Sequence, residues 1–439
     1  MNSETLLSKK EKKAVSPEIW KLSIAVMLAA VSTTMTFSVS PMYMKEVLGF
    51  SLISIGVIEG LSEGLSQLSK LMSGVFGDYF RKRKPPLILG FILAALSKPL
   101  FILAGSPLWI TVSKLTERIS NGLTATPRDA FVADESTPEN RGASFGVMMT
   151  LKTIGCAAGS FLIGGMIFVA GKMGYTVDYK LLLWIGFVPC LVAVYMITYT
   201  VRESAAVGVP SASLGSRKGV RKDDDQKLRF ADVRLLSSRY WMFLVIASLF
   251  MLARFADGLL VLRMQTLGAP IWICAMVIGI FNIVSSVCCF PIGDLSDRMP
   301  RAKILYFSFV TLILSHLCFY AGADMMVGPF VINSAYLGII FWGAQRGTSQ
   351  ILFSAIISEE VPPKVTGTAL GIFNLTSGMA AVAAGYCAGY ISDDKIQLPF
   401  LVGAIVAGVA LVTLIIWNVY IDNKAVPVQV TCTKVRKTA

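Results

Sequence analysis

A charged segment occurs twice in this chain, in degenerate form and at the same place in each half. The first copy runs from Gly74 to Lys84 and the second from Gly293 to Lys303. Each copy lies between two long apolar stretches, so each is expected to be a short loop between two membrane-spanning helices. A second repeat, in which two acids and a proline precede paired glycines, begins at Asp134 and again at Glu359. Two repeats in matching positions indicate an internal duplication.

Apolar runs of about 20 residues, the length of a helix that crosses a bilayer, recur along the whole chain. Hydrophobic residues make up 54% of the chain and charged residues only 15%, whereas a soluble protein carries about a quarter charged residues. About twelve spans are predicted. They lie near 19–40, 52–76, 86–105, 107–131, 142–170, 180–201, 241–264, 270–292, 303–322, 329–356, 367–390 and 398–421. The predicted fold class is all-α integral membrane, with two pseudo-symmetric six-helix bundles.

Lysine and arginine cluster beside alternate spans, which gives the expected orientation. The net charge of +13 is concentrated in these flanking segments, as the positive-inside rule requires, and does not indicate nucleic-acid binding. Both termini are therefore expected to be cytoplasmic. The predicted parts are a cytoplasmic tail at 1–18, an N-terminal bundle at 19–201, a cytoplasmic linker at 202–239, a C-terminal bundle at 240–422 and a cytoplasmic tail at 423–439.

Residues typical of metal sites and of catalysis are scarce. Seven of the eight cysteines lie within spans without metal-ligand spacing, and the one histidine, His316, lies in an apolar stretch. The sequence contains no P-loop and no catalytic histidine arrangement. We therefore expect neither a metal site, nor a cofactor, nor an enzyme.

The duplicated loop resembles the motif of the major facilitator superfamily, Gly-x-x-x-Asp-(Arg)-x-x-Arg-(Arg/Lys). Gly74, Asp78 and Arg81 fit the first copy, in which Tyr79 replaces a usual basic residue, and Gly293, Asp297, Arg298 and Arg301 fit the second. The resemblance implies a monomeric secondary carrier with a central cavity between two bundles. The segment from Arg128 to Gly142 is similar to bacterial members of the family, some of which transport siderophores or metabolites. This implies an inner (plasma) membrane protein.

Several charged residues lie within the spans, where they usually face a pathway. The family's first, fourth, seventh and tenth helices line the cavity. Arg118, Arg254 and Arg346 lie near mid-depth on three of these helices, and Asn121 and Lys152 accompany them. An arginine fork suits a carboxylate or phosphate. These five residues are the predicted binding site for a small organic anion, a carboxylate or siderophore-like metabolite.

Structural ion pairing is the alternative explanation of these charges. The pairs that it predicts are Arg254 with Asp257, Lys114 with Glu117 and Arg118 with Glu63. Three mid-depth arginines would nevertheless be hard to neutralise from the few nearby acids, which favours an anionic solute.

Coupling to a proton requires a group that changes its protonation. Glu63, Glu117 and Asp257 are the predicted coupling residues, because burial favours the neutral form of a carboxyl group. Proton symport is expected, while sodium coupling and exchange against a second anion stay open.

Charged residues at the loop motifs are predicted to gate one side of the membrane. Such pairs would hold that side closed in one state and break in the other; incidental charges that follow the positive-inside rule are the alternative. Asp134 is the expected partner of the first loop copy and Glu359 of the second. The predicted gating residues are Asp78, Arg81, Arg128, Asp134, Arg141, Asp297, Arg298, Arg301 and Glu359.

The direction of transport depends on the glycines of the fifth span. Many exporters of the family carry a Gly-Pro step there, and this chain has Gly159 followed by Ser160. The missing proline and the basic residues favour uptake. The alternative is a multidrug or metabolite exporter with proton antiport.

Overall fold

The computed structural model describes residues 15–79, 83–137, 140–202, 236–327, 330–362, 365–393 and 395–424. Most of the predicted linker and of the two predicted tails therefore lies outside the described residues.

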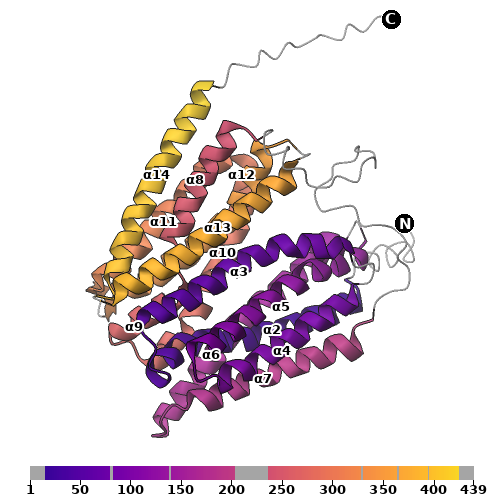
Figure 1. Cartoon of the computed structure of the whole chain (residues 1–439), viewed down its shortest axis with the longest axis vertical. Coiled ribbons are helices and arrows are strands. Elements are labelled where there is room, and N and C mark those ends of the chain that lie inside the picture. Colours follow the sequence, from indigo (N-terminus) through magenta and orange to yellow (C-terminus); the bar gives the residue numbers. More distant parts are fainter. Residues whose placement is uncertain are drawn as a thin grey trace, which may run out of the picture.

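The N-terminal half is a bundle of long helices (Figure 1). Three of them have a proline in their first turn. A backbone N–H has no partner within the helix at this position, so a proline, which lacks that N–H, is tolerated there. Asp178 caps another, because its carboxylate accepts the N–H groups of Lys180 and Leu181. The helices are α2 (Pro17–Met42), which continues as the π-helix η1 (Tyr43–Val47), α3 (Leu52–Tyr79), α4 (Lys84–Leu103), α5 (Pro107–Asp134), α6 (Arg141–Lys172) and α7 (Tyr179–Tyr195), which continues as η2 (Met196–Thr200).

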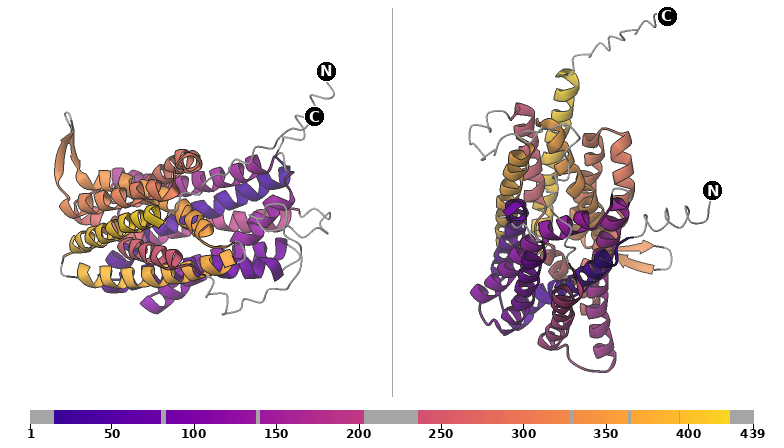
Figure 2. Two further views of the ribbon diagram at one scale, coloured as in Figure 1. Left: turned by 90° about the horizontal axis from the view of Figure 1, so that it is seen from above. Right: turned by 90° about the vertical axis from the view of Figure 1, so that its right-hand side faces the viewer.

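The C-terminal half repeats this plan with two irregularities. Its first span is interrupted, and a two-stranded antiparallel hairpin precedes α12 and projects beyond the helices (Figure 2). The elements are α8 (Ser238–Ala253), α9 (Asp257–Thr266), α10 (Ile271–Arg298), α11 (Arg301–Ala321), β1 (Asp324–Val327), β2 (Phe330–Asn333), α12 (Ser334–Glu360), α13 (Thr366–Ser392) and α14 (Leu398–Lys424).

Two predicted spans differ from the structure. The seventh, at 241–264, is two helices, and the tenth, at 329–356, begins as a strand. In the hairpin Asp324 pairs with Asn333, and the Asn333 side chain accepts the Ala335 N–H and so begins α12. The apolar residues of β2 continue directly into α12, so a hydropathy pattern cannot separate strand from helix.

Nine helical segments in the described part of the chain are long and apolar enough to cross a membrane. The helices α3, α5 and α12 are not among these nine. They are also the helices that carry Glu63, Arg118 and Arg346. The all-α membrane fold is thus confirmed, and its polar helices are those that supply the candidate site.

The two bundles are closest at the end that holds α9 and diverge toward the end where α2 begins and α14 ends (Figure 1). Helix α3 packs against α13, and α6 packs against α10. A Cβ atom at Gly385 of α13 would lie 2.5 Å from the Gly56 carbonyl oxygen of α3 and 2.6 Å from the Gly60 Cα atom. Glycine on both helices therefore allows the backbones to touch where the halves meet.

Candidate functional site

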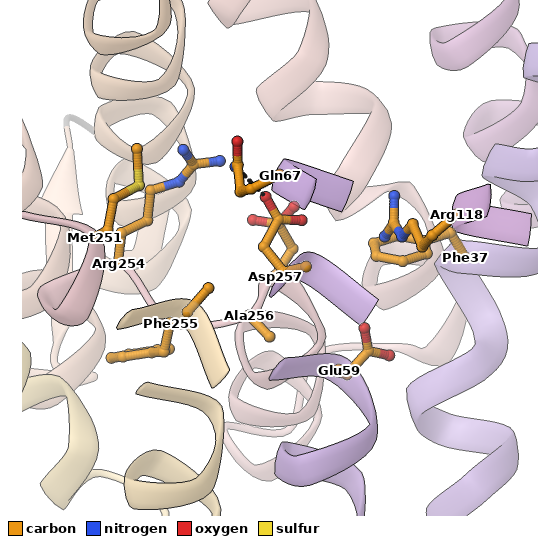
Figure 3. A pocket seen from close by; sticks show the side chains of 11 residues that line it. Phe37, Glu59, Gln67, Arg118, Met251, Arg254, Phe255, Ala256 and Asp257 are labelled. Atoms are coloured by element: carbon orange, nitrogen blue, oxygen red, sulfur yellow. Dashed lines mark hydrogen bonds between the residues drawn. The ribbon is translucent and has the colours of Figure 1, made fainter. Parts of the chain in front are cut away.

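A pocket lies between the two bundles (Figure 3). The N-terminal half contributes residues of α2, α3 and α5, and the C-terminal half contributes residues of α8, α9, α13 and the segment between α8 and α9. The lining residues are Phe37, Glu59, Glu63, Gln67, Arg118, Met251, Arg254, Phe255, Ala256, Asp257 and Ala381. Since both halves form its wall, any relative movement of the bundles changes this pocket.

The interruption between α8 and α9 forms one side of the pocket. Arg254 leaves the helical region with ψ at 83°, and Ala256 is extended with ψ at 139°. Asp257 then begins α9, where a negative charge is favourable at a helix N-terminus. Irregular backbone at membrane depth is tolerated where it is buried in protein or lines a cavity. Residues 254–256 contain neither proline nor glycine, and the one local signal is Asp257-Gly258 directly after them, a dipeptide typical of turns.

Two arginines face this pocket from opposite bundles. Arg118 of α5 lies over the ring of Phe37, with its guanidinium carbon 5.1 Å from the ring centre. Arg254 points toward Gln67 (Figure 3). Among the residues that the structure describes, neither guanidinium group forms an ion pair with a carboxylate. Both side chains are thus placed to meet a group that enters the pocket.

The third predicted arginine, Arg346, is already paired. Its guanidinium group donates to Asp257 at 2.5 Å and lies over the ring of Phe281. Trp342 donates to the other oxygen of Asp257 at 2.9 Å. The predicted pairing of Arg254 with Asp257 is therefore wrong, because Arg346 of α12 reaches that carboxylate. Arg346 lies behind the lining residue Asp257 and is not itself part of the lining.

Two further ion pairs are buried in the N-terminal bundle. Lys114 of α5 donates to Glu59 of α3, and Lys98 of α4 donates to Glu117 of α5. Lys114 also donates to the Ser40 hydroxyl at 3.1 Å. These pairs replace the predicted pairing of Lys114 with Glu117. The predicted pair of Arg118 with Glu63 is not formed either. Lys114 and Glu117 thus pair with residues of other helices and not with each other.

The three predicted coupling acids have different positions. Glu63 lines the pocket and accepts a hydrogen bond from Gln67 at 3.3 Å, and Asp257 lines it from the opposite bundle. Glu63 also interacts electrostatically with Arg254 and Arg346. Glu117 is not among the lining residues and is neutralised by Lys98.

The remaining predicted binding residues, Asn121 and Lys152, are not part of the pocket lining. Asn121 is exposed, and Lys152 interacts electrostatically with Arg128 and Asp129. Arg128 itself is paired with Asp129 at 3.0 Å.

The predicted gating residues are described only in part. Asp134 pairs with Arg83 at 3.3 Å, and Glu359 pairs with Arg301 at 2.7 Å, each within its own bundle. Arg141 is exposed. Outside the described residues lie Arg81 and the side chains of Asp78, Asp297 and Arg298.

A contact at the α9 end, not expected from the sequence, joins the two bundles. The Glu46 carboxylate of η1 accepts the Tyr179 hydroxyl of its own bundle at 2.6 Å and also accepts the Gln265 amide of α9. In the part of the chain that is described, no three or more His, Cys, Asp or Glu residues are grouped so as to hold a metal ion.

Comparison with known proteins decides the family. The sequence profile described as Major Facilitator Superfamily matches residues 22–386. This chain belongs to the Major Facilitator Superfamily. An uncharacterized MFS-type transporter of Methanocaldococcus jannaschii is 27% identical over 406 residues, which span 90% of this chain and 93% of that protein. The multidrug resistance protein MdtH of Proteus mirabilis is 29% identical over 163 residues, 36% of this chain and 38% of MdtH.

The fold agrees with this assignment. The crystal structure of a D323A mutant of the nucleoside transporter NupG superposes with a TM-score of 0.73 and 16% identity, over 91% of this chain and 99% of that chain. The chain is accordingly a multi-pass membrane transporter, with a small-molecule solute as its substrate, and its family is not one of enzymes.

Proposed function

We propose that this major facilitator is a secondary carrier for a small organic anion, a carboxylate or a siderophore-like metabolite. The observation that supports it most directly is the pair of arginines, Arg118 and Arg254, which face one pocket from opposite bundles and form no salt bridge with a carboxylate of the described residues. A carboxylate or phosphate that bridged them would receive charge-assisted hydrogen bonds from both halves of the protein. The solute would thereby draw the bundles together, as alternating access requires.

The charges of the lining also favour an anion. Glu59 is neutralised by Lys114, and Asp257 by Arg346. With Lys114 and Arg346 counted, the four cationic side chains at the pocket exceed its three carboxylates, those of Glu59, Glu63 and Asp257. An anion is favourable in such a pocket, because a partly desolvated excess of positive charge attracts a negative group strongly.

Glu63 is the proposed coupling residue of a proton symporter that performs uptake. A proton on Glu63 removes a negative charge that competes with the solute for Arg254. Proton binding and anion binding therefore strengthen each other, which is the thermodynamic requirement for symport. Asp257 is a weaker candidate, since Arg346 and Trp342 stabilise its charged form.

The basic flanking segments support an inner-membrane orientation with both termini in the cytoplasm. The bundles diverge toward the end where α2 begins and α14 ends (Figure 1). In that orientation the described conformation is open toward the cytoplasm.

A proton-antiport exporter is the second candidate. The partial match to MdtH favours it, as do the apolar side chains of Phe37, Met251 and Phe255 in the pocket. A lipophilic cation would use these side chains together with Glu63.

The test uses purified protein in liposomes loaded with a pH-sensitive dye. Di- and tricarboxylates, carboxylate siderophores, sugar phosphates and cationic drugs are added separately, and solute-triggered proton movement is recorded. We expect a response to carboxylates. In Arg118→Gln and Arg254→Gln the half-saturating concentration should rise roughly tenfold to a hundredfold, the effect of losing one charged hydrogen bond.

Lys172→Gln is the matched control, since it removes a positive charge at the end of α6, outside the pocket lining. It should leave the half-saturating concentration unchanged. A response confined to lipophilic cations, or normal carboxylate transport by both arginine variants, would exclude the anion carrier.

A further inference from the structure

The single histidine of this chain lies directly behind the interruption of the seventh span. His316 of α11 is fully buried, and its Nε2 atom lies 3.1 Å from the carbonyl oxygen of Ala253, the last residue of α8. A carbonyl oxygen only accepts, so Nε2 must carry the proton and donate. The other ring nitrogen, Nδ1, has no hydrogen-bond partner. One defined tautomer therefore binds the carbonyl group at the point where the helix stops.

The interruption removes the helical hydrogen bond that the Ala253 carbonyl would normally accept. In a continuous α-helix it would accept the N–H of Asp257, four residues later. Here it accepts the Phe255 N–H at 3.2 Å and the imidazole of His316 instead. An unsatisfied carbonyl group is strongly unfavourable in a membrane interior. The hydrogen bond from His316 satisfies the Ala253 carbonyl and thereby stabilises the irregular backbone.

Aromatic contacts fix the ring in this position. The His316 ring centre lies 5.0 Å from that of Phe255, which is part of the interruption, and 5.8 Å from that of Trp342. On the side of α14, a Cβ atom at Gly403 would lie 2.7 Å from the imidazole, so only glycine leaves room for the ring. These tertiary contacts act together with the Asp257-Gly258 dipeptide at the start of α9 to interrupt the helix.

We propose that His316 is a positioning residue, which holds α8 and α9 apart and thereby keeps Phe255 and Asp257 in the pocket lining. Without it, the chain satisfies the Ala253 carbonyl by continuing the helix into residues 254–257. The Arg254 N–H already bonds to the Phe250 carbonyl as in a helix, so the change falls on ψ of Arg254, which goes from 83° to about −42°. Residues 255–257 then turn away from their positions at the pocket. The consequence for solute binding rests on the proposed function of this pocket, whereas the effect on the backbone does not.

Hydrogen–deuterium exchange measured by mass spectrometry tests this on the full-length protein in nanodiscs, without any solute. Three variants are compared with the wild type: His316→Leu, His316→Gln and Ser315→Ala. In His316→Leu, peptides that cover residues 254–259 should exchange roughly tenfold more slowly, the effect of gaining about one buried hydrogen bond. His316→Gln should behave like the wild type, because the glutamine amide can donate from the place of Nε2.

Ser315→Ala is the matched control. Ser315 is the neighbouring buried residue of α11 and donates to the Gly338 carbonyl at 2.7 Å, away from the interruption. Its removal should leave exchange at 254–259 unchanged. Unchanged exchange in His316→Leu would overturn the proposal. A second result would also overturn it: both His316→Leu and Ser315→Ala lose protection throughout the C-terminal bundle. His316 would then only fill space in the packed bundle. Neither outcome depends on the identity of the solute.

Discussion

At the scale of single residues, α5 directs three charged side chains to three different neighbours. Lys114 is bound by α3, Glu117 is bound by α4, and Arg118 faces the pocket. The two buried ion pairs fix the rotation of α5 about its axis. They therefore determine that Arg118, which has no such partner, is the charge presented to a solute.

Breaking one of these pairs should be costly. In Lys98→Met, the Glu117 carboxylate remains buried without its cation, and we expect a loss of about 3–5 kcal/mol of stability. Thermal unfolding in detergent, followed by intrinsic fluorescence, measures the effect. The double variant Lys98→Met/Glu117→Leu should recover most of the loss, because it removes both charges. A double variant as unstable as the single one would contradict this account.

The pairing of charges is also where the sequence was least informative. Arg118, Arg254, Glu63 and Asp257, which the sequence placed in the protein interior, all line one pocket. Two of the predicted ion pairs, Arg254 with Asp257 and Lys114 with Glu117, joined residues one turn apart, yet the structure pairs Asp257 and Lys114 with residues on other helices. Pairing across helices depends on the rotation of each helix, which a single sequence does not specify.

At the scale of helices, the contact between α3 and α13 depends on the absence of side chains. At Gly385 the three atoms nearest to an added Cβ atom are all backbone atoms of α3, which cannot rotate away. The two helices belong to different bundles, so this contact stabilises the described conformation relative to one in which the bundles have separated there.

Gly385→Ala should therefore shift the population away from this conformation. Overpacking costs typically about 1–3 kcal/mol, so the separated state should gain roughly tenfold. A cysteine at position 53 of α3, introduced after replacement of the native cysteines, should be alkylated faster in this variant. Gly367→Ala is the control on the same helix, because a Cβ atom there meets nothing within 4 Å. Equal alkylation rates in the two variants would contradict the proposed role of the contact.

Most helices follow from apolar length alone, as α13 and α14 show. They begin at 366 and 398, against predicted starts at 367 and 398, and they end two and three residues past their predicted ends at 390 and 421. The interruption after Ala253 was missed because the contacts of His316 and Phe255 act across helices, and the local Asp257-Gly258 dipeptide did not by itself indicate a break. The hairpin before α12 was missed because its second strand is apolar.

At the scale of the whole molecule, the two bundles are joined at the α9 end by a hydrogen bond from Gln265 to Glu46. Tyr179 orients the same carboxylate from within the N-terminal bundle. Opening of the pocket toward this end requires that the bond to Gln265 break. The contact thus belongs to one of the two states that alternating access needs.

Glu46→Ala should raise the population of the state that is open at the α9 end. The effect is expected to be roughly threefold, since an exposed hydrogen bond contributes little free energy. Pulsed electron–electron resonance between spin labels at positions 47 and 266 measures it as a longer distance. In Glu46→Gln the amide oxygen can still accept the Gln265 amide while its NH2 group donates to the Tyr179 hydroxyl, so this variant should resemble the wild type. If Glu46→Ala leaves the distance distribution unchanged, Glu46 does not hold the bundles together.

The helices α3, α5 and α12 are not among the nine helical segments of the described chain that are long and apolar enough to cross a membrane. Their polarity also constrains how the protein is inserted into the membrane. As the nascent chain leaves the ribosome, Glu59 of α3 reaches the membrane well before Lys114 of α5 has been synthesised. An isolated charge at the centre of an inserting helix costs about 2.5–3.5 kcal/mol at the translocon. The insertion machinery must therefore retain α3 until α5 arrives. The polarity that creates the pocket thus makes biogenesis of the N-terminal half a concerted step of at least three helices.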